Sequence, residues 1–152
     1  MFSGPHSHAL DDKGRTMVPK DFRAHLDSLG ERSLVMTYAL GAPRRLEVRP
    51  AALFSVFQQR FNERPTPQGM AHYREQFREM YFGEAEWVEV DKAGRVLIPA
   101  EKRRAVGLGD RVVFVGMGDE RFQLWRPEDR AKVFTFCDDH SEAIREMLVE
   151  GT

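Results

Sequence analysis

A chain of 152 residues with 41% hydrophobic and 31% charged residues can form one ordinary domain or two small ones, and this composition argues against wholesale disorder. No apolar run approaches the roughly 20 residues that span a bilayer, and the single cysteine, Cys137, excludes an internal disulfide, so we expect a cytoplasmic protein with no membrane partner. The formal net charge of −1 argues against a uniformly basic surface, so any DNA-binding face must concentrate its positive charge locally.

The first predicted element is a tight hairpin near the N-terminus. Leu10 is followed by Asp-Asp-Lys-Gly-Arg and then by residues suited to a strand, an order that predicts a turn closed by Gly14 at positive φ. Pro19 ends the second strand and suits the first turn of a short helix that carries Arg23. A second hairpin is predicted next, from a strand over 34–38 through a turn at 41–43 to a return strand ending at position 48.

Two amphipathic helices are predicted after the second hairpin. The first begins at Pro50, and its apolar face consists of Leu53, Phe57 and Phe61. The run Pro65-Thr-Pro-Gln-Gly interrupts it. The second begins near Met70, and its apolar face consists of Met70, Tyr73, Phe77 and either Met80 or Tyr81.

The remainder of the chain repeats the first part. The segment 10–23 aligns without a gap with the segment 90–103, at an offset of 80 positions, and 35–50 aligns with 112–127 at an offset of 77. The second copy therefore predicts the same elements, with Gly94 closing the turn and Pro99 preceding a helix that holds Arg103. After Pro127 a further helix is expected, followed by a tail with a weak apolar stripe from position 141.

Each copy reads as β-β-α-β-β in fewer than about 50 residues, which is too little chain to bury a self-sufficient core. The two copies should therefore complete one another. The sequence predicts an α+β fold made of duplicated halves with flanking helices.

The two Asp-x-x-x-Arg repeats, the opening Met-Phe-x-Gly, the spacer 74–82 and the ending Gly-Asp-Glu-Arg-Phe-Gln-Leu-Trp resemble the MraZ family, which looks like two SpoVT/AbrB-type half-domains in one chain. The resemblance implies a pseudo-symmetric swapped-hairpin β-barrel with a first domain over 5–50, a helical connector over 51–80, a second domain over 81–127 and a C-terminal helical segment over 128–152. It also implies a ring-like homo-oligomer, associated with the nucleoid, that binds double-stranded DNA at promoter repeats of the division and cell-wall gene cluster.

Arg15 and Arg95 are the leading candidates for DNA contact, because each follows a turn glycine and can project from a narrow two-stranded ribbon. A guanidinium can bridge guanine O6 and N7 with two parallel hydrogen bonds. Asp11 and Asp91, four positions earlier, are expected to pair with these arginines and orient them. The weaker candidates are Lys13 and Lys92, which do not align with each other and are assigned to phosphate contacts.

Other interpretations stay open beside this one. Each Asp-x-x-x-Arg pair could be a surface ion pair that only supports the fold, and the chain could be an antitoxin-like or scaffold oligomer that binds a protein partner. The arginines of the second hairpins are expected to form a solvated face or an inter-subunit contact; they are Arg44, Arg45, Arg49, Arg121 and Arg126. The histidines form no metal-ligand motif, Cys137 and His140 are a weak thiol and base pair, and no phosphate-binding glycine loop occurs, so we expect no enzyme, cofactor or metal.

Overall fold

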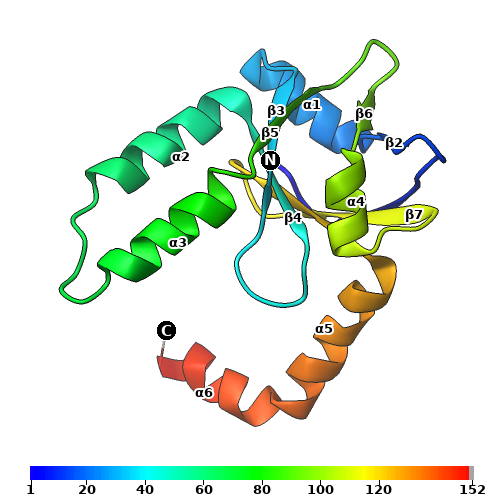
Figure 1. Cartoon of the computed structure of the whole chain (residues 1–152). Helices are drawn as coiled ribbons and strands as arrows, with labels where there is room; N and C mark the ends of the chain where they lie inside the picture. The colour runs from blue at the N-terminus through cyan, green and yellow to red at the C-terminus, as the bar shows by residue number, and fades with distance from the viewer. Residues whose placement is uncertain (151–152) are drawn as a thin grey trace.

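The computed structural model describes residues 1–150 and shows an α+β fold in which one order of elements occurs twice (Figure 1). The first half consists of β1 (Pro5–Ala9), β2 (Arg15–Met17), α1 (Lys20–Leu29), β3 (Ser33–Tyr38) and β4 (Leu46–Pro50). The second half consists of β5 (Glu86–Glu89), β6 (Arg95–Leu97), α4 (Ala100–Val106), β7 (Arg111–Gly116) and β8 (Phe122–Trp125). The repeated β-β-α-β-β order predicted from the duplication is confirmed.

Four further helices surround the two halves. They are α2 (Ala51–Glu63) and α3 (Ala71–Tyr81) between the halves, and α5 (Pro127–Asp139) and α6 (Ser141–Glu150) after them. In Figure 1, α2 and α3 lie together on one side of the molecule, whereas α5 and α6 extend from the second half as an arc. Among residues 1–150, no helix is long and apolar enough to cross a bilayer.

The two halves exchange strands. One antiparallel sheet has the order β1-β7-β8-β4-β3-β5, so that β1 of the first half pairs with β7 of the second, and β5 of the second pairs with β3 of the first. The remaining strands, β2 and β6, pair only with each other in a two-stranded antiparallel sheet. Neither half supplies a complete sheet by itself, because each is too small. The exchange of strands completes one sheet from both halves.

The exchange also corrects the expectation of a local hairpin in each copy. The first turn forms as predicted, with the N–H of Asp11 donating to the carbonyl of Arg15 at 2.9 Å, but only the Leu10–Thr16 bridge joins the two arms beyond it. The strands then separate to partners in the other half. Local sequence predicted the tight turn, whereas the pairing of its two arms depends on strands of the other half, β7 for β1 and β6 for β2.

A single apolar core joins residues of both halves. Its largest members include Phe22 on α1, Phe114 on β7 and Phe122 on β8, which are almost completely buried. A second cluster attaches the helical connector to the sheet through Phe54 on α2 and Tyr81 on α3, both packed against Val35.

The predicted apolar face of the first connector helix was rotated from the observed one. Phe54 is 2% exposed and is the most deeply buried side chain of α2, whereas Leu53, Phe57 and Phe61 are only partly buried. Phe57 and Phe61 still pack on the rings of α3, so the helix lies against two surfaces rather than along one stripe.

Candidate nucleic-acid interface

The strands β2 and β6 bring the two repeated arginines into one ribbon. The cross-strand pairs are Arg15–Leu97, Thr16–Val96 and Met17–Arg95. Because side chains alternate between the faces of a strand, the outer pairs share one face, and the central pair lies on the other. Thr16 and Val96 are buried in the core, whereas Met17 and Leu97 are exposed. The outer face therefore carries two arginines on one diagonal and two apolar side chains on the other.

The first turn holds Arg15 through Asp11. One carboxylate oxygen of Asp11 accepts the backbone N–H groups of Lys13 at 3.0 Å and Arg15 at 2.8 Å. The other oxygen accepts the Nε–H of Arg15 at 2.8 Å. Asp11 thus closes the turn and contacts the guanidinium with the same side chain. Both side chains remain more than one-third exposed, so the pair contributes little to folding stability.

The second turn repeats this geometry. Asp91 accepts the backbone N–H groups of Ala93 and Arg95, each at 2.9 Å, and the Nε–H of Arg95 at 3.0 Å. The agreement between the two copies extends to the atoms involved. In both, the aspartate binds Nε, while Nη1 and Nη2 make no hydrogen bond within residues 1–150.

These contacts lower the pKa of both aspartates. The backbone N–H of Arg15 is the largest cause for Asp11, with the guanidinium adding to it, and the pKa falls from 3.8 to about 2. The backbone N–H of Arg95 lowers the pKa of Asp91 in the same way. Both carboxylates therefore stay ionised at neutral pH and hold an ionised arginine at a fixed edge.

The two turn lysines are placed differently from the arginines. Lys13 and Lys92 are both exposed at the turns, and neither side chain forms an ion pair with any residue from 1 to 150. Their ammonium groups are available to solvent. They stand next to the ribbon, but the structure assigns them no fixed contact.

Gly14 and Gly94 are required in the turns for two reasons, their backbone conformation and the lack of space for a side chain. Their φ angles are +91° and +89°, a region that other residues rarely adopt. A Cβ at position 14 would also lie 2.5 Å from Nε of Arg103, and a Cβ at position 94 would lie 2.8 Å from Cδ of Arg23. Arg23 of α1 therefore packs on the turn of the second half, and Arg103 of α4 packs on the turn of the first half.

Arg23 and Arg103, which the sequence placed on the helices after the two turns, consequently help to join the halves by packing on the opposite turn. A hydrogen bond within its own half holds each arginine over the opposite turn: the Nε–H of Arg23 donates to the carbonyl of Val18 at 3.1 Å, and that of Arg103 donates to the carbonyl of Ile98 at 2.9 Å. Their matched positions in the repeat were the available signal. The exposed Met17 and Leu97 were also overlooked, because alternation reveals their face only when the β2–β6 pairing is known.

The expectation of a solvated face or inter-subunit contact is wrong for Arg49. This residue is 5% exposed, and its guanidinium lies 4.0 Å from the ring centroid of Phe57. It pairs with Glu47 at 3.1 Å and contacts the hydroxyl of Tyr81. Tyr81 in turn donates to Glu47, and hydrogen bonds to Tyr81 and Gln123 and the nearby guanidinium of Arg49 outweigh burial to lower the pKa of Glu47. Arg49 thus anchors the connector helix α3 to β4.

The thiol, the histidine base and the possible metal ligands do not come together in a catalytic or metal-binding site within residues 1–150. Cys137 is a free, exposed thiol on α5, and His140 directs its Nδ1 to the carbonyl of Phe136 at 2.9 Å. Within residues 1–150, no three His, Cys, Asp or Glu side chains are grouped so that they could hold a metal ion.

Comparison with known proteins finds similar sequences over most of the chain. The family model described as "MraZ protein, putative antitoxin-like" matches residues 1–74 and 81–136. A protein of Leuconostoc citreum named transcriptional regulator MraZ is 31% identical over 150 residues, covering 99% of this chain and 98% of the relative. Proteins of the same name from Roseiflexus castenholzii and Lachnoclostridium phytofermentans are 31% identical over 150 residues and 37% identical over 128 residues. The former match covers 99% of this chain and 98% of the relative, and the latter 84% and 83%.

Proposed function

The chain belongs to the MraZ family, and on that premise we propose that it is a sequence-specific DNA-binding transcriptional regulator that acts through Arg15 and Arg95. The observation that carries the proposal is the β2–β6 ribbon, which presents both arginines on one exposed face. Its target is repeated sites in the promoter of the division and cell-wall gene cluster.

The ribbon has the dimensions and donors for the major groove. That groove admits a two-stranded β-ribbon, and a guanidinium that bridges O6 and N7 of guanine contributes roughly 1–3 kcal/mol of discrimination against other bases. In both turns the aspartate binds Nε, which leaves the two terminal nitrogens free to donate hydrogen bonds to a base. Asp11 and Asp91 are then positioning residues, and Lys13 and Lys92 add contacts to phosphate.

The finer architecture belongs to the same proposal. The ribbon and the six-stranded sheet close into a swapped-hairpin barrel, and the Leu10–Thr16 bridge between the residue after β1 and strand β2 supports this closure. Hydrogen bonds from the N–H of Val18 to the carbonyl of Gly94 and from the N–H of Ile98 to the carbonyl of Gly14 extend the β2–β6 pairing to the turns. The domains extend over 5–50 and 81–127, with 51–80 as connector and 128–152 as a C-terminal segment. Several copies form a ring-like homo-oligomer in the cytoplasm, associated with the nucleoid. A ring presents several ribbons to repeated sites, which multiplies contacts that are individually weak and offsets the net charge of −1.

A mobility-shift titration on the DNA upstream of its own gene tests this function. Wild-type protein should prefer that fragment to a scrambled one, and Arg15→Ala with Arg95→Ala should abolish the preference. The matched control is Arg60→Ala with Arg145→Ala, which removes the same charge from two exposed arginines outside the ribbon. If wild type shows no preference, or if the ribbon variant binds as tightly as the control, the proposal is wrong and a scaffold that binds a protein partner becomes the better account.

A further inference from the structure

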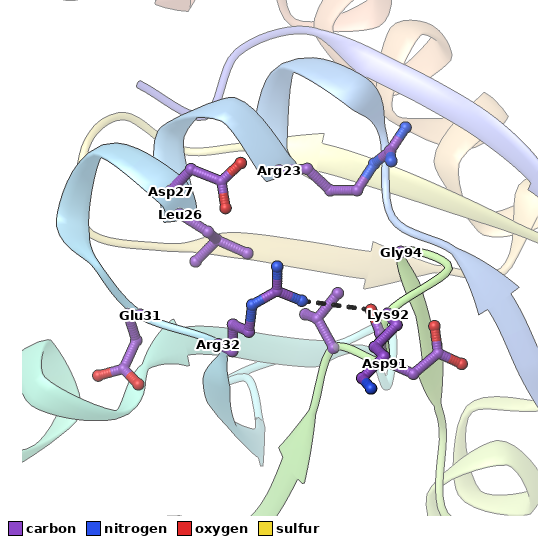
Figure 2. A pocket seen from close by; sticks show the side chains of 9 residues that line it. Arg23, Leu26, Asp27, Glu31, Arg32, Asp91, Lys92 and Gly94 are labelled. Atoms are coloured by element: carbon purple, nitrogen blue, oxygen red, sulfur yellow. Dashed lines mark hydrogen bonds between the residues drawn. The ribbon is translucent and has the colours of Figure 1, made fainter.

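A small pocket lies beside the second turn, next to the ribbon (Figure 2). Its volume is about 90 Å³, and its lining includes Arg23 and Leu26 of α1, Arg32 before β3, and Lys92 and Gly94 of the turn. Figure 2 shows Arg32 reaching toward the turn, where its Nη1 lies 3.5 Å from the carbonyl oxygen of Asp91. The pocket therefore adjoins the turn from which Arg95 projects.

The pocket lining contains three cations and three carboxylates, which are Arg23, Arg32, Lys92, Asp27, Glu31 and Asp91. Arg23, Arg32 and Lys92 form no salt bridge with any residue from 1 to 150. Glu31 accepts the backbone N–H groups of Ser33 and Ala52, and Asp91 binds its own turn and Arg95.

Asp27 is the remaining carboxylate in the lining, and it is exposed to solvent. Among residues 1–150, Asp91 is the one lining carboxylate whose charge is paired, by Arg95, because backbone N–H groups leave the charge of Glu31 in place. The three cations therefore face the two charges of Asp27 and Glu31, and the pocket has an excess of a single positive charge. An anion of the size of a phosphate group is the ligand that this excess would attract.

Beside the first turn, the two positions that correspond to Arg32 and Lys92 carry the opposite charge, although the exposed Lys13 remains on that turn. The N–H of Val90 donates to the carbonyl of Arg32 at 2.9 Å, and the N–H of Leu10 donates to the carbonyl of Asp110 at 2.8 Å, so Asp110 occupies the place of Arg32. The repeat likewise aligns Asp12 with Lys92. Two cations of the second turn are thus replaced by two acids at the first.

We propose that the pocket of Arg23, Arg32 and Lys92 seats a backbone phosphate of the bound DNA, and that the first turn has no equivalent seat. The inference rests on the proposed function, because the ribbon must occupy the groove for the adjoining strand to reach the pocket. Guanidinium and ammonium groups bind phosphate strongly, while Asp12 and Asp110 repel it. One end of the ribbon therefore holds the backbone, and the nearly symmetric ribbon binds DNA in one preferred direction.

The salt dependence of binding tests the phosphate seat. Fluorescence anisotropy of the labelled upstream fragment, between 50 and 200 mM salt, would be compared for wild type and for Arg32→Ala, which removes a cation of the pocket and keeps Lys92. Loss of one phosphate contact lowers the slope of log affinity against log salt by about 0.9 per engaged ribbon, so the affinity falls about 3.5-fold less over this range. The control is again Arg60→Ala with Arg145→Ala, which should keep the wild-type slope.

The mirrored variant provides the opposite test. Asp12→Lys with Asp110→Arg gives the first turn the charges of the second, and it should tighten binding at 50 mM salt and steepen the slope by about 0.9 per ribbon. If wild type discriminates the upstream fragment but neither variant changes the slope relative to the control, the phosphate seat is wrong while the proposed function stands. If wild type does not discriminate the upstream fragment from scrambled DNA, both the phosphate seat and the proposed function are wrong.

A titration of wild-type protein with inorganic phosphate, followed by NMR, separates the two sources of the anion. We expect no saturable binding, because a single free phosphate lacks the support of the neighbouring groove contacts. Saturable binding that disappears in Arg32→Ala with Lys92→Ala would mark a small-anion site and overturn the assignment to the DNA backbone.

Discussion

Replacing Gly14 by alanine is expected to lower the free energy of unfolding by about 1–5 kcal/mol, once the roughly 0.4–1 kcal/mol that alanine gains by restricting the unfolded chain is subtracted. A φ of +91° costs an alanine roughly 1–2 kcal/mol. The new Cβ would also lie 2.9 Å from the carbonyl oxygen of Ile98 and 2.5 Å from Nε of Arg103. Two hydrogen bonds lie at this contact. The N–H of Ile98 donates to the carbonyl of Gly14 at 2.8 Å, and the Nε–H of Arg103 donates to the carbonyl of Ile98 at 2.9 Å. Weakening each costs roughly 0.5–1.5 kcal/mol.

Gly30→Ala is the matched control, because it shares the positive φ without the close contacts. Gly30 ends α1 with a φ of +65°, and a Cβ there would meet no atom within 4 Å. Its conformational cost is partly offset by the roughly 0.4–1 kcal/mol that alanine gains by restricting the unfolded chain. The net loss of unfolding free energy at this position should therefore lie between about 0 and 1.6 kcal/mol.

Urea unfolding, monitored through the fluorescence of the buried Trp125 at one fixed protein concentration, would measure both variants. A loss at position 14 that exceeds the loss at position 30 by about 2 kcal/mol supports the interlocked turns. Equal losses would refute the reasoning, since backbone conformation alone would then account for the effect. Arg103→Ala combined with Gly14→Ala should recover only part of the loss, because the Ile98 carbonyl remains in place.

Three further outcomes are expected. Tyr81→Phe should lower the free energy of unfolding by about 1–3 kcal/mol in the same urea assay, because Glu47 loses a buried donor; an unchanged midpoint would contradict this. The stability contributed by Asp11 should be complete above pH 3.8 and be lost as the pH falls toward 2, since its folded pKa is depressed, and Asp11→Asn should flatten that segment of a pH-dependent urea series. An upstream fragment prepared with deoxyuridine in place of thymidine should bind wild type more weakly than normal DNA, because exposed Met17 and Leu97 lose thymine methyl contacts; Met17→Ala with Leu97→Ala should bind both fragments alike, and an equal preference in that variant and wild type would count against the contact.

The sequence predicted the turns and helix starts of this fold better than the partners of its strands. Turn chemistry placed Gly14 and Gly94, and the prolines at 19 and 99 marked the starts of α1 and α4, because these features depend on a few neighbouring residues. The partners of β1, β2 and β5 depend on the other half of the chain, and no local pattern distinguishes an exchanged strand from a hairpin arm.

Arg49 illustrates the same limit at the level of a side chain. An arginine on a return strand is ordinarily exposed, and its burial follows from Phe57 and Tyr81, which belong to helices outside the repeat. The Asp-to-Arg spacing, in contrast, suggested both ion pairs of the turns, because residues four apart across a tight turn are held near each other by the turn itself. What those ion pairs contact outside the chain remains a prediction.

The unequal surroundings of the two turns matter because the ribbon itself is nearly symmetric. With only Arg15, Met17, Arg95 and Leu97 to distinguish its ends, the ribbon would fit a groove almost equally well in either direction, since a half-turn exchanges each arginine with the other. Promoter repeats that point the same way require a protein that distinguishes the directions.

The residues able to break the symmetry lie beside the ribbon, where Arg32 and Lys92 stand in one half and Asp110 and Asp12 in the other. A duplicated chain can vary such residues independently in its two copies, which two identical half-domains cannot do. Duplication within one chain therefore permits a directional contact that a symmetric dimer of halves would lack.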